Sequence, residues 1–166
     1  MQRPFPELPL EEWEETKITL HLWMQIVGKV KLDLMPRRNH WWHITLFVSP
    51  KGITTSSIPD PRGSFQIDFN FIEHILEFNC SWGTQRSFEL KDGLSVAQFH
   101  QKFFEILYEL KIPARISAIP YDHPCEEPFD KCETYKSYDP EYIVKFWRAL
   151  ISIDNVFREF SGRFLG

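Results

Sequence analysis

A strict alternation of apolar and polar residues in the middle of the chain constrains the fold more than any other feature. At residues 65–71 the odd-numbered positions are phenylalanine or isoleucine, and Gln, Asp and Asn stand between them. A second run, from Leu76 to Cys80, alternates in the same way. A period of two places successive side chains on opposite faces of a β-strand. We therefore expect an antiparallel hairpin with one face built of rings and one polar face.

Further strands are expected on both sides of this hairpin. Four segments are rich in β-branched and aromatic residues and are bounded by turn residues: Trp41–Ser49, Ile53–Ile58, Arg86–Leu90 and Arg115–Ile119. Together with the central hairpin they predict an antiparallel sheet of about five to six strands, most of them joined by short connections.

Three helices are expected around the sheet. The first starts near Leu10 and ends before Pro36. The second follows Ser95, which has Gln98 at the capping-box position, and the third follows Asp139, an N-cap residue with proline directly after it. The predicted fold class is α+β, with an antiparallel sheet and three helices mainly on its apolar face.

Length and composition set the expected domain organisation. At 166 residues the chain is expected to form a single domain, 1–166, with an extended Pro-rich segment at 1–9 and a long acidic loop at 120–138. The sequence is 43% hydrophobic and 16% aromatic, which is enough for a sizeable core of rings.

Charge and targeting signals exclude several classes of partner. The net charge is −4 and no basic stripe is present, so we expect no nucleic-acid partner. No apolar run reaches membrane-spanning length and no secretory leader opens the sequence, so we expect no membrane partner. The three cysteines do not make an even disulfide framework, which predicts a cytoplasmic protein with reduced thiols.

The segment 39–60 is the strongest candidate for a site, because it combines adjacent tryptophans, two histidines and a hydroxyl-rich stretch. If 41–49 is a strand, its even-numbered residues face the core and its odd-numbered residues, Trp41, His43, Thr45 and Phe47, join the polar face. Rings on a polar face are typical of a packed junction or a ligand wall. The alternative without a site is a solvated sheet face, which antiparallel sheets commonly have.

The central hairpin adds carboxylates to the same face. It places Asp68 opposite either Glu77 or Asn79, and opposed carboxylates repel unless they are solvated, protonated or bridged by a cation. A histidine beside a carboxylate suits proton transfer or an anionic ligand. The candidate catalytic residues are His43, Asp68 and Glu77, and the candidate ligand-binding residues are Trp41, His43, Thr45 and Thr55.

No metal or cofactor is expected. His40 and His43 would lie on opposite sides of a strand, and the His123, Cys125 and Cys132 set lacks a C-x-x-C pair. The sequence also contains no G-x-S-x-G, no P-loop and no Gly-rich dinucleotide fingerprint.

The chain resembles a bacterial family of uncharacterised proteins, a domain-of-unknown-function family. The matching stretches include P-E-L-P-L-E-E-W, N-H-W-W-H-I-T-L, G-I-T-T-S and S-Y-D-P-E, at residues 6–13, 39–46, 52–56 and 137–141. The resemblance covers nearly the whole chain and implies no activity, so no catalytic residue is carried over. Members of that family look longer, which implies that this chain is a fragment or a short relative. Their loop before S-Y-D-P also has a His and more Asp, where this chain has Cys132 and Tyr135.

Two functions stay open. One is a small-molecule-binding or enzymatic domain with its site around Trp41, His43 and Thr45, which requires His43 to converge with Asp68 or Glu77 in a concave pocket. The other is a non-catalytic interaction or structural module, the N-terminal part of a longer protein, which binds a protein partner or a missing C-terminal segment. The second function requires a flat, wet sheet and an exposed apolar patch on the last helix.

Overall fold

The computed structural model describes residues 5–123 and 125–164. Residues 1–4 of the predicted extended segment and Pro124 of the predicted acidic loop lie outside the described residues. Three α-helices, two 3₁₀-helices and six strands follow one another as η1 (Leu10–Glu12), α1 (Glu14–Leu34), η2 (Asn39–Ile44), β1 (Phe47–Ser49), β2 (Gly52–Thr54), β3 (Ile58–Asp60), β4 (Gly63–Asn70), β5 (Ile75–Cys80), β6 (Gln85–Glu89), α2 (Val96–Glu109) and α3 (Pro140–Gly162).

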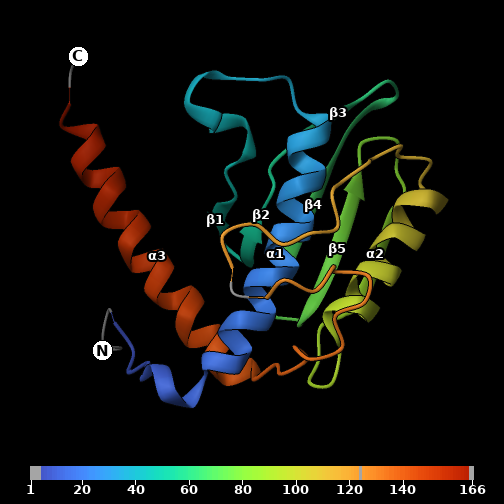
Figure 1. Ribbon diagram of the computed structural model, residues 1–166. Helices are drawn as coiled ribbons and strands as arrows, with labels where there is room; N and C mark the ends of the chain where they lie inside the picture. Colours follow the sequence, from blue (N-terminus) through green and yellow to red (C-terminus); the bar gives the residue numbers. More distant parts are fainter. Residues whose placement is uncertain (1–4, 124, 165–166) are drawn as a thin grey trace.

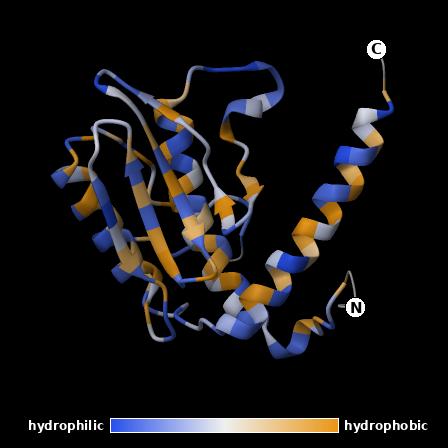
Figure 2. Cartoon of the chain, turned by 180° about the vertical axis from the view of Figure 1, so that it is seen from behind, coloured by the Kyte–Doolittle hydropathy of each residue, from blue (hydrophilic) through white to orange (hydrophobic). Residues whose placement is uncertain are grey.

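The predicted α+β fold class is confirmed. The strands form one antiparallel sheet in the order β1-β2-β4-β5-β6, and β3 also pairs with β4. Helices α1 and α2 lie on one face of this sheet, and α3 runs beside it from the bottom of the molecule toward the upper left (Figure 1). Figure 2 shows the molecule from behind, with the other face of the sheet toward the viewer. None of the described helices lies across this face, which we call the open face.

The predicted strand Ile53–Ile58 is wrong, because the structure splits it into β2 and β3. Thr55 lies between the two, and its hydroxyl accepts the backbone N–H of Ile67 at 3.0 Å, where a continuous strand would offer a carbonyl. Ser56 then adopts a left-handed conformation, with φ of 57°, which redirects the chain. A side-chain hydrogen bond therefore competes with the ladder at this point.

The predicted strand Arg115–Ile119 is also wrong, because it is neither part of the sheet nor a regular element. Instead its backbone bonds to side chains of α1: the N–H of Arg115 donates to Asp33, and the carbonyls of Ser117 and Ile119 accept from Lys29.

The apolar face of the sheet forms the core, as the alternation predicts. Phe65, Ile67, Phe69, Leu76 and Phe78 are all buried there beneath α1 and α2. The helix caps are confirmed as well. Ser95 and Gln98 form a reciprocal capping box at the start of α2, and the Asp139 carboxylate accepts from two backbone N–H groups of α3.

Replacement of Phe69 by alanine tests this core directly. The ring is fully buried and stacks on Phe99 at 6.3 Å, so Phe69→Ala should lower the free energy of unfolding by about 3–5 kcal/mol. Tyr108→Ala is the matched control, because this ring is 86% exposed and its loss should cost less than about 0.5 kcal/mol. Both values come from equilibrium denaturation. A loss below about 1 kcal/mol for Phe69→Ala would show that this face of the sheet is not the core.

Candidate interaction surface

The segment that carries Trp41 and His43 is a 3₁₀-helical turn, so the predicted strand Trp41–Ser49 is wrong except for its last three residues. His40 and Trp41 have φ values of 54° and 58°, which are left-handed and incompatible with an extended strand. His43 is buried in η2, where its Nδ1 accepts the backbone N–H of Arg38 at 3.2 Å. The strand parity that placed Trp41 and His43 on the polar sheet face therefore does not apply.

A buried lysine explains where the strand begins. The ammonium of Lys31, on α1, donates to the carbonyl oxygens of Thr45 at 2.5 Å and Thr55 at 2.6 Å, and lies 4.8 Å from the centre of the Phe47 ring. Burial, and to a lesser degree the charge of Arg38, lowers the pKa of Lys31. These bonds hold Thr45 at α1, so sheet pairing begins only after it, at Phe47. Sequence reasoning missed Lys31, because nothing in the local pattern marks a lysine as buried.

The two predicted carboxylates do come together on the open face of the sheet. Asp68 and Glu77 are register partners on β4 and β5, and both are buried among their neighbours. The Gln66 amide donates to both Asp68 oxygens at 2.9 Å, and the Asn70 amide donates to Glu77 at 3.0 Å. The Lys51 ammonium lies 3.9 Å from Glu77. Neighbouring amides and one lysine thus satisfy this pair.

The predicted site residues therefore fall into three separate groups. Trp41 stacks on His43, the carbonyls of Thr45 and Thr55 share the Lys31 ammonium, and Asp68 and Glu77 bond to amides of the open sheet face. A cavity of about 320 Å³ borders Trp41, and its lining runs from Arg37 to Trp41 without Asp68 or Glu77. A ligand role for these residues stays a prediction.

Helix α3 has two different halves. In its first half, Trp147 is buried and its indole N–H donates to the Ser49 carbonyl at 3.1 Å, while Phe146 packs on Trp13 with 5.3 Å between ring centres. The second half stands away from the body of the molecule in both ribbon views (Figures 1 and 2). Strand β1 and Trp13, the residue before α1, therefore anchor only the beginning of this helix.

The second half of α3 carries an exposed apolar stripe. Four members lie on the helix and the fifth, Phe164, lies two residues past its end. They recur at helical spacing and are strongly exposed: Ile153 (39%), Val156 (59%), Phe157 (66%), Phe160 (71%) and Phe164 (78%). We call these five residues the α3 stripe. Trp41, Trp42 and Phe47 are exposed as well, and their elements, η2 and β1, lie on the α3 side of the sheet (Figure 1). A row of exposed apolar residues such as the α3 stripe marks an interaction surface.

Charged residues accompany the α3 stripe on the same helix half. Asp154 pairs with Arg158, and Glu159 pairs with Arg163, each four residues apart. With its charged side, this helix is no candidate for a membrane span, and none of the helices in residues 5–123 and 125–164 reaches the length and apolarity needed to cross a bilayer.

The loop before α3 brings two cysteines into contact. Cys125 and Cys132 are buried with 3.9 Å between their sulfur atoms, and burial raises the pKa of Cys132 to about 11, which keeps it a thiol. His123 accepts the N–H of Cys125 at 2.9 Å. Within the described part of the chain, no three His, Cys, Asp or Glu side chains gather in a geometry that could hold a metal ion. The expectation of no bound metal stays a prediction.

Comparison with known proteins adds a family but no activity. The model of a family of unknown function, DUF5996, matches residues 5–166. The chain belongs to the DUF5996 family. No curated protein and no solved structure matches it. DUF5996 is a family of unknown function, so the match assigns no role to the α3 stripe.

The contacts of Lys31 predict that replacing it by methionine, a side chain of similar shape, strongly lowers the stability of the fold. Lys31→Met keeps the apolar stem but leaves the carbonyls of Thr45 and Thr55 without their donor, so it should lower the free energy of unfolding by about 2–4 kcal/mol. Lys102→Met, at an exposed position of α2, is the control and should change it by less than about 0.5 kcal/mol. Urea denaturation measures both. Equal stability of the two variants would show that Lys31 does not hold η2 and β1 in place.

Proposed function

We propose that this chain is a protein-interaction module that pairs with a second copy of itself through the α3 stripe. The observation that carries the proposal is the exposure of Phe157 and Phe160 on a helix half that leaves the body of the molecule, with exposed Phe164 two residues past the end of the helix. Exposing these rings to water is unfavourable, and pairing with another apolar helix face would remove them from it.

The spacing of the stripe supports helix pairing. Successive members are three or four residues apart, apart from the adjacent Val156 and Phe157, so they form a narrow seam along one side of α3. A seam with this spacing is suited to packing against one partner helix, and its exposure shows that no core of the described residues covers it.

The sequence of α3 is complementary to itself in the antiparallel direction. A two-fold axis between Val156 and Phe157 sets these two residues against each other, and it sets Ile153 of one copy against Phe160 of the other. The same axis brings Asp154 of one copy beside Arg158 of the other, twice per pair, because these two residues share one flank of the helix.

The size of the stripe also suits a dimer. Given the about 150–250 Å² of an aromatic side chain, the exposed parts of the five members offer on the order of 600 Å² per copy. A pair would then bury roughly 1,200 Å², at the lower end of the range for specific interfaces. Exposed Trp41 and Trp42, on η2, would enlarge this area if the second copy reached them.

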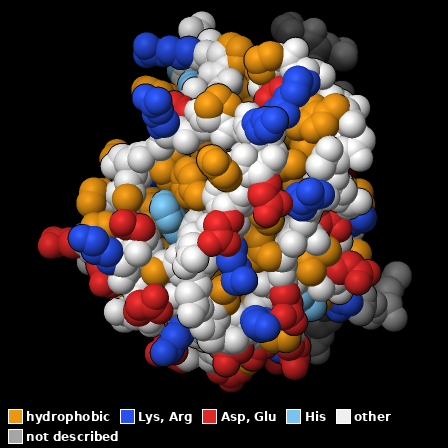
Figure 3. Space-filling view, turned by 90° about the vertical axis from the view of Figure 1, so that its right-hand side faces the viewer, with side chains coloured by type: hydrophobic (Ala, Val, Ile, Leu, Met, Phe, Trp, Pro, Cys, Tyr) orange, Lys and Arg blue, Asp and Glu red, His pale blue; other side chains and the backbone are white. Residues whose placement is uncertain are grey.

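The proposed partner is a protein, in a reducing cytoplasm. Acidic and basic side chains are interspersed over the face in Figure 3, without the single-sign field that favours nucleic acid or anionic membranes. The three cysteines are free thiols, and the close Cys125 and Cys132 pair is unbonded, which supports a reducing compartment.

Sedimentation of the 166-residue chain at increasing concentration tests the proposal, with a monomer–dimer equilibrium as the expected result. Phe157→Glu places a charge in the seam and should raise the dimer dissociation constant at least tenfold, or about 1.4 kcal/mol. Tyr108→Glu, on an exposed ring outside the stripe, should leave it unchanged.

Charge reversal tests the antiparallel register. Asp154→Arg and Arg158→Asp should each weaken the dimer several-fold, and the double variant should restore it, because both intermolecular pairs are re-formed. A chain that is monomeric at all concentrations would refute self-pairing and leave another protein as the partner of the stripe. A dimer that Phe157→Glu does not weaken would place the interface elsewhere.

A further inference from the structure

An extended segment of the chain is strapped to the outer side of α1. Residues 115–121, which we call the strap, are held by three side chains spaced four apart on the helix. Asp33 accepts the Arg115 N–H at 2.8 Å, Lys29 donates to the Ser117 carbonyl at 3.0 Å, and the Gln25 amide exchanges two bonds of 2.8 Å with the Tyr121 backbone. The strap thus runs antiparallel to α1, with backbone groups of Arg115, Ser117 and Tyr121 bonded to α1 side chains.

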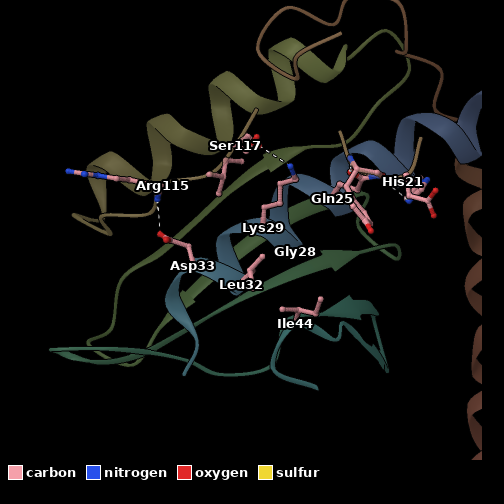
Figure 4. A pocket seen from close by; sticks show the side chains of 12 residues that line it. His21, Gln25, Gly28, Lys29, Leu32, Asp33, Ile44, Arg115 and Ser117 are labelled. Atoms are coloured by element: carbon pink, nitrogen blue, oxygen red, sulfur yellow. Dashed lines mark hydrogen bonds between the residues drawn. The ribbon is translucent and has the colours of Figure 1, made fainter. Parts of the chain in front are cut away.

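A cavity of about 580 Å³ lies between the strap and α1 (Figure 4). Its lining is mainly apolar and comes from three separate parts of the chain: Leu32 of α1, Ile44 of η2 and Ile116 of the strap. This volume lies within the about 300–1,000 Å³ that small-molecule sites occupy.

A glycine opens the floor of the cavity. Gly28 lies in the middle of α1, where glycine costs about 1 kcal/mol relative to alanine, and a Cβ built on it would meet no atom within 4 Å. The space is therefore available because this position has no side chain. A glycine that weakens a helix and borders an apolar cavity is consistent with a ligand that approaches the backbone closely.

The lining contains two basic residues, Lys29 and Arg115, and two acidic residues, Asp33 and Asp122. The Arg115 side chain is directed away from the cavity (Figure 4). His21 closes one end, and its pKa is lowered by burial and, second, by Lys17, so the ring is neutral at pH 7. Lys29 and Asp33 are already bonded to the strap backbone, so neither is free to bind a charged ligand.

We propose that this cavity is a binding site for a small, uncharged molecule with an apolar ring body and a hydrogen-bonding group. The ring body would lie over Gly28 between Leu32, Ile44 and Ile116. The polar group would lie toward the His21 ring at the end of the cavity, because the Gln25 amide is already bonded to the Tyr121 backbone and lies 3.3 Å from His21 Nε2. This inference is independent of the α3 stripe, because α3 contributes no residue to the lining.

The test uses four uncharged aromatic probes, indole, quinoline, coumarin and 2-naphthol, titrated into the full chain and followed by NMR. At least one should bind wild-type protein, and Gly28→Leu should weaken that binding at least tenfold by filling the floor of the cavity, with Gly28→Ala intermediate. Gly162→Leu is the matched control, since Gly162 is also a helical glycine with open space around it and should leave binding unchanged.

Each other outcome overturns the inference. Circular dichroism first establishes that Gly28→Leu is folded, as the open space and the better helix propensity of leucine predict. If no probe binds wild-type protein at millimolar concentration, the cavity is not a site for this class of ligand. If binding survives Gly28→Leu, or is lost on Phe157→Glu instead, the probes occupy another surface. Stronger binding of 2-naphthoate than of 2-naphthol would show that the ligand class is anionic.

Discussion

One buried tryptophan joins the three helices, and the rest of the architecture follows from its position. Trp23, in the middle of α1, is fully buried, with its ring centre 5.0 Å from that of Phe99 on α2 and 5.6 Å from that of Tyr138, which directly precedes the cap of α3. Its indole N–H has no hydrogen-bond partner among the described residues. Burying an unpaired N–H is costly, so the stacking of the rings is what holds Trp23 there.

This arrangement uses the apolar face of the sheet for α1 and α2 and leaves little of it for α3. The last helix starts just after Tyr138, gains β1 and Trp13 as neighbours through Trp147 and Phe146, and then runs past the edge of the core. Its exposed stripe is therefore a consequence of where α3 is anchored. The outer side of α1 is likewise free of the core, and it carries the polar row that holds the strap and the glycine that opens the cavity.

Sequence patterns predict the elements whose structure follows from local periodicity. They fail where a side chain distant in the sequence determines the backbone conformation. The alternation around Phe69 and Phe78 predicts the central hairpin, its buried face and the meeting of Asp68 with a β5 carboxylate or amide. The pattern before Phe47 is misleading because Lys31, 14 residues before Thr45, bonds the end of that segment. The sequence of the strap is also misleading. An extended segment has the same residue pattern whether its backbone bonds to a strand or to the side chains of a helix.

Only part of the candidate surface can be predicted from the sequence, for a related reason. The apolar spacing along α3 is visible in the sequence, and an exposed patch on the last helix is one of the two alternatives that the sequence leaves open. The spacing of apolar residues is the same whether a helix faces a core or a partner, so the exposure of Phe157 and Phe160 cannot be predicted from spacing. Only the position of Trp147 on the sheet edge shows that the second half of the helix extends beyond the core.

Hydrogen exchange of the α3 amides at low and high protein concentration tests the central claim most directly. If the second half of α3 has no partner in its own chain, amides of 153–162 should exchange far faster than amides of 143–150 in dilute protein. They should become protected as copies pair at high concentration. If 153–162 is as protected as the first half of the helix in dilute protein, the stripe packs within a single chain, and pairing of two copies through it is contradicted.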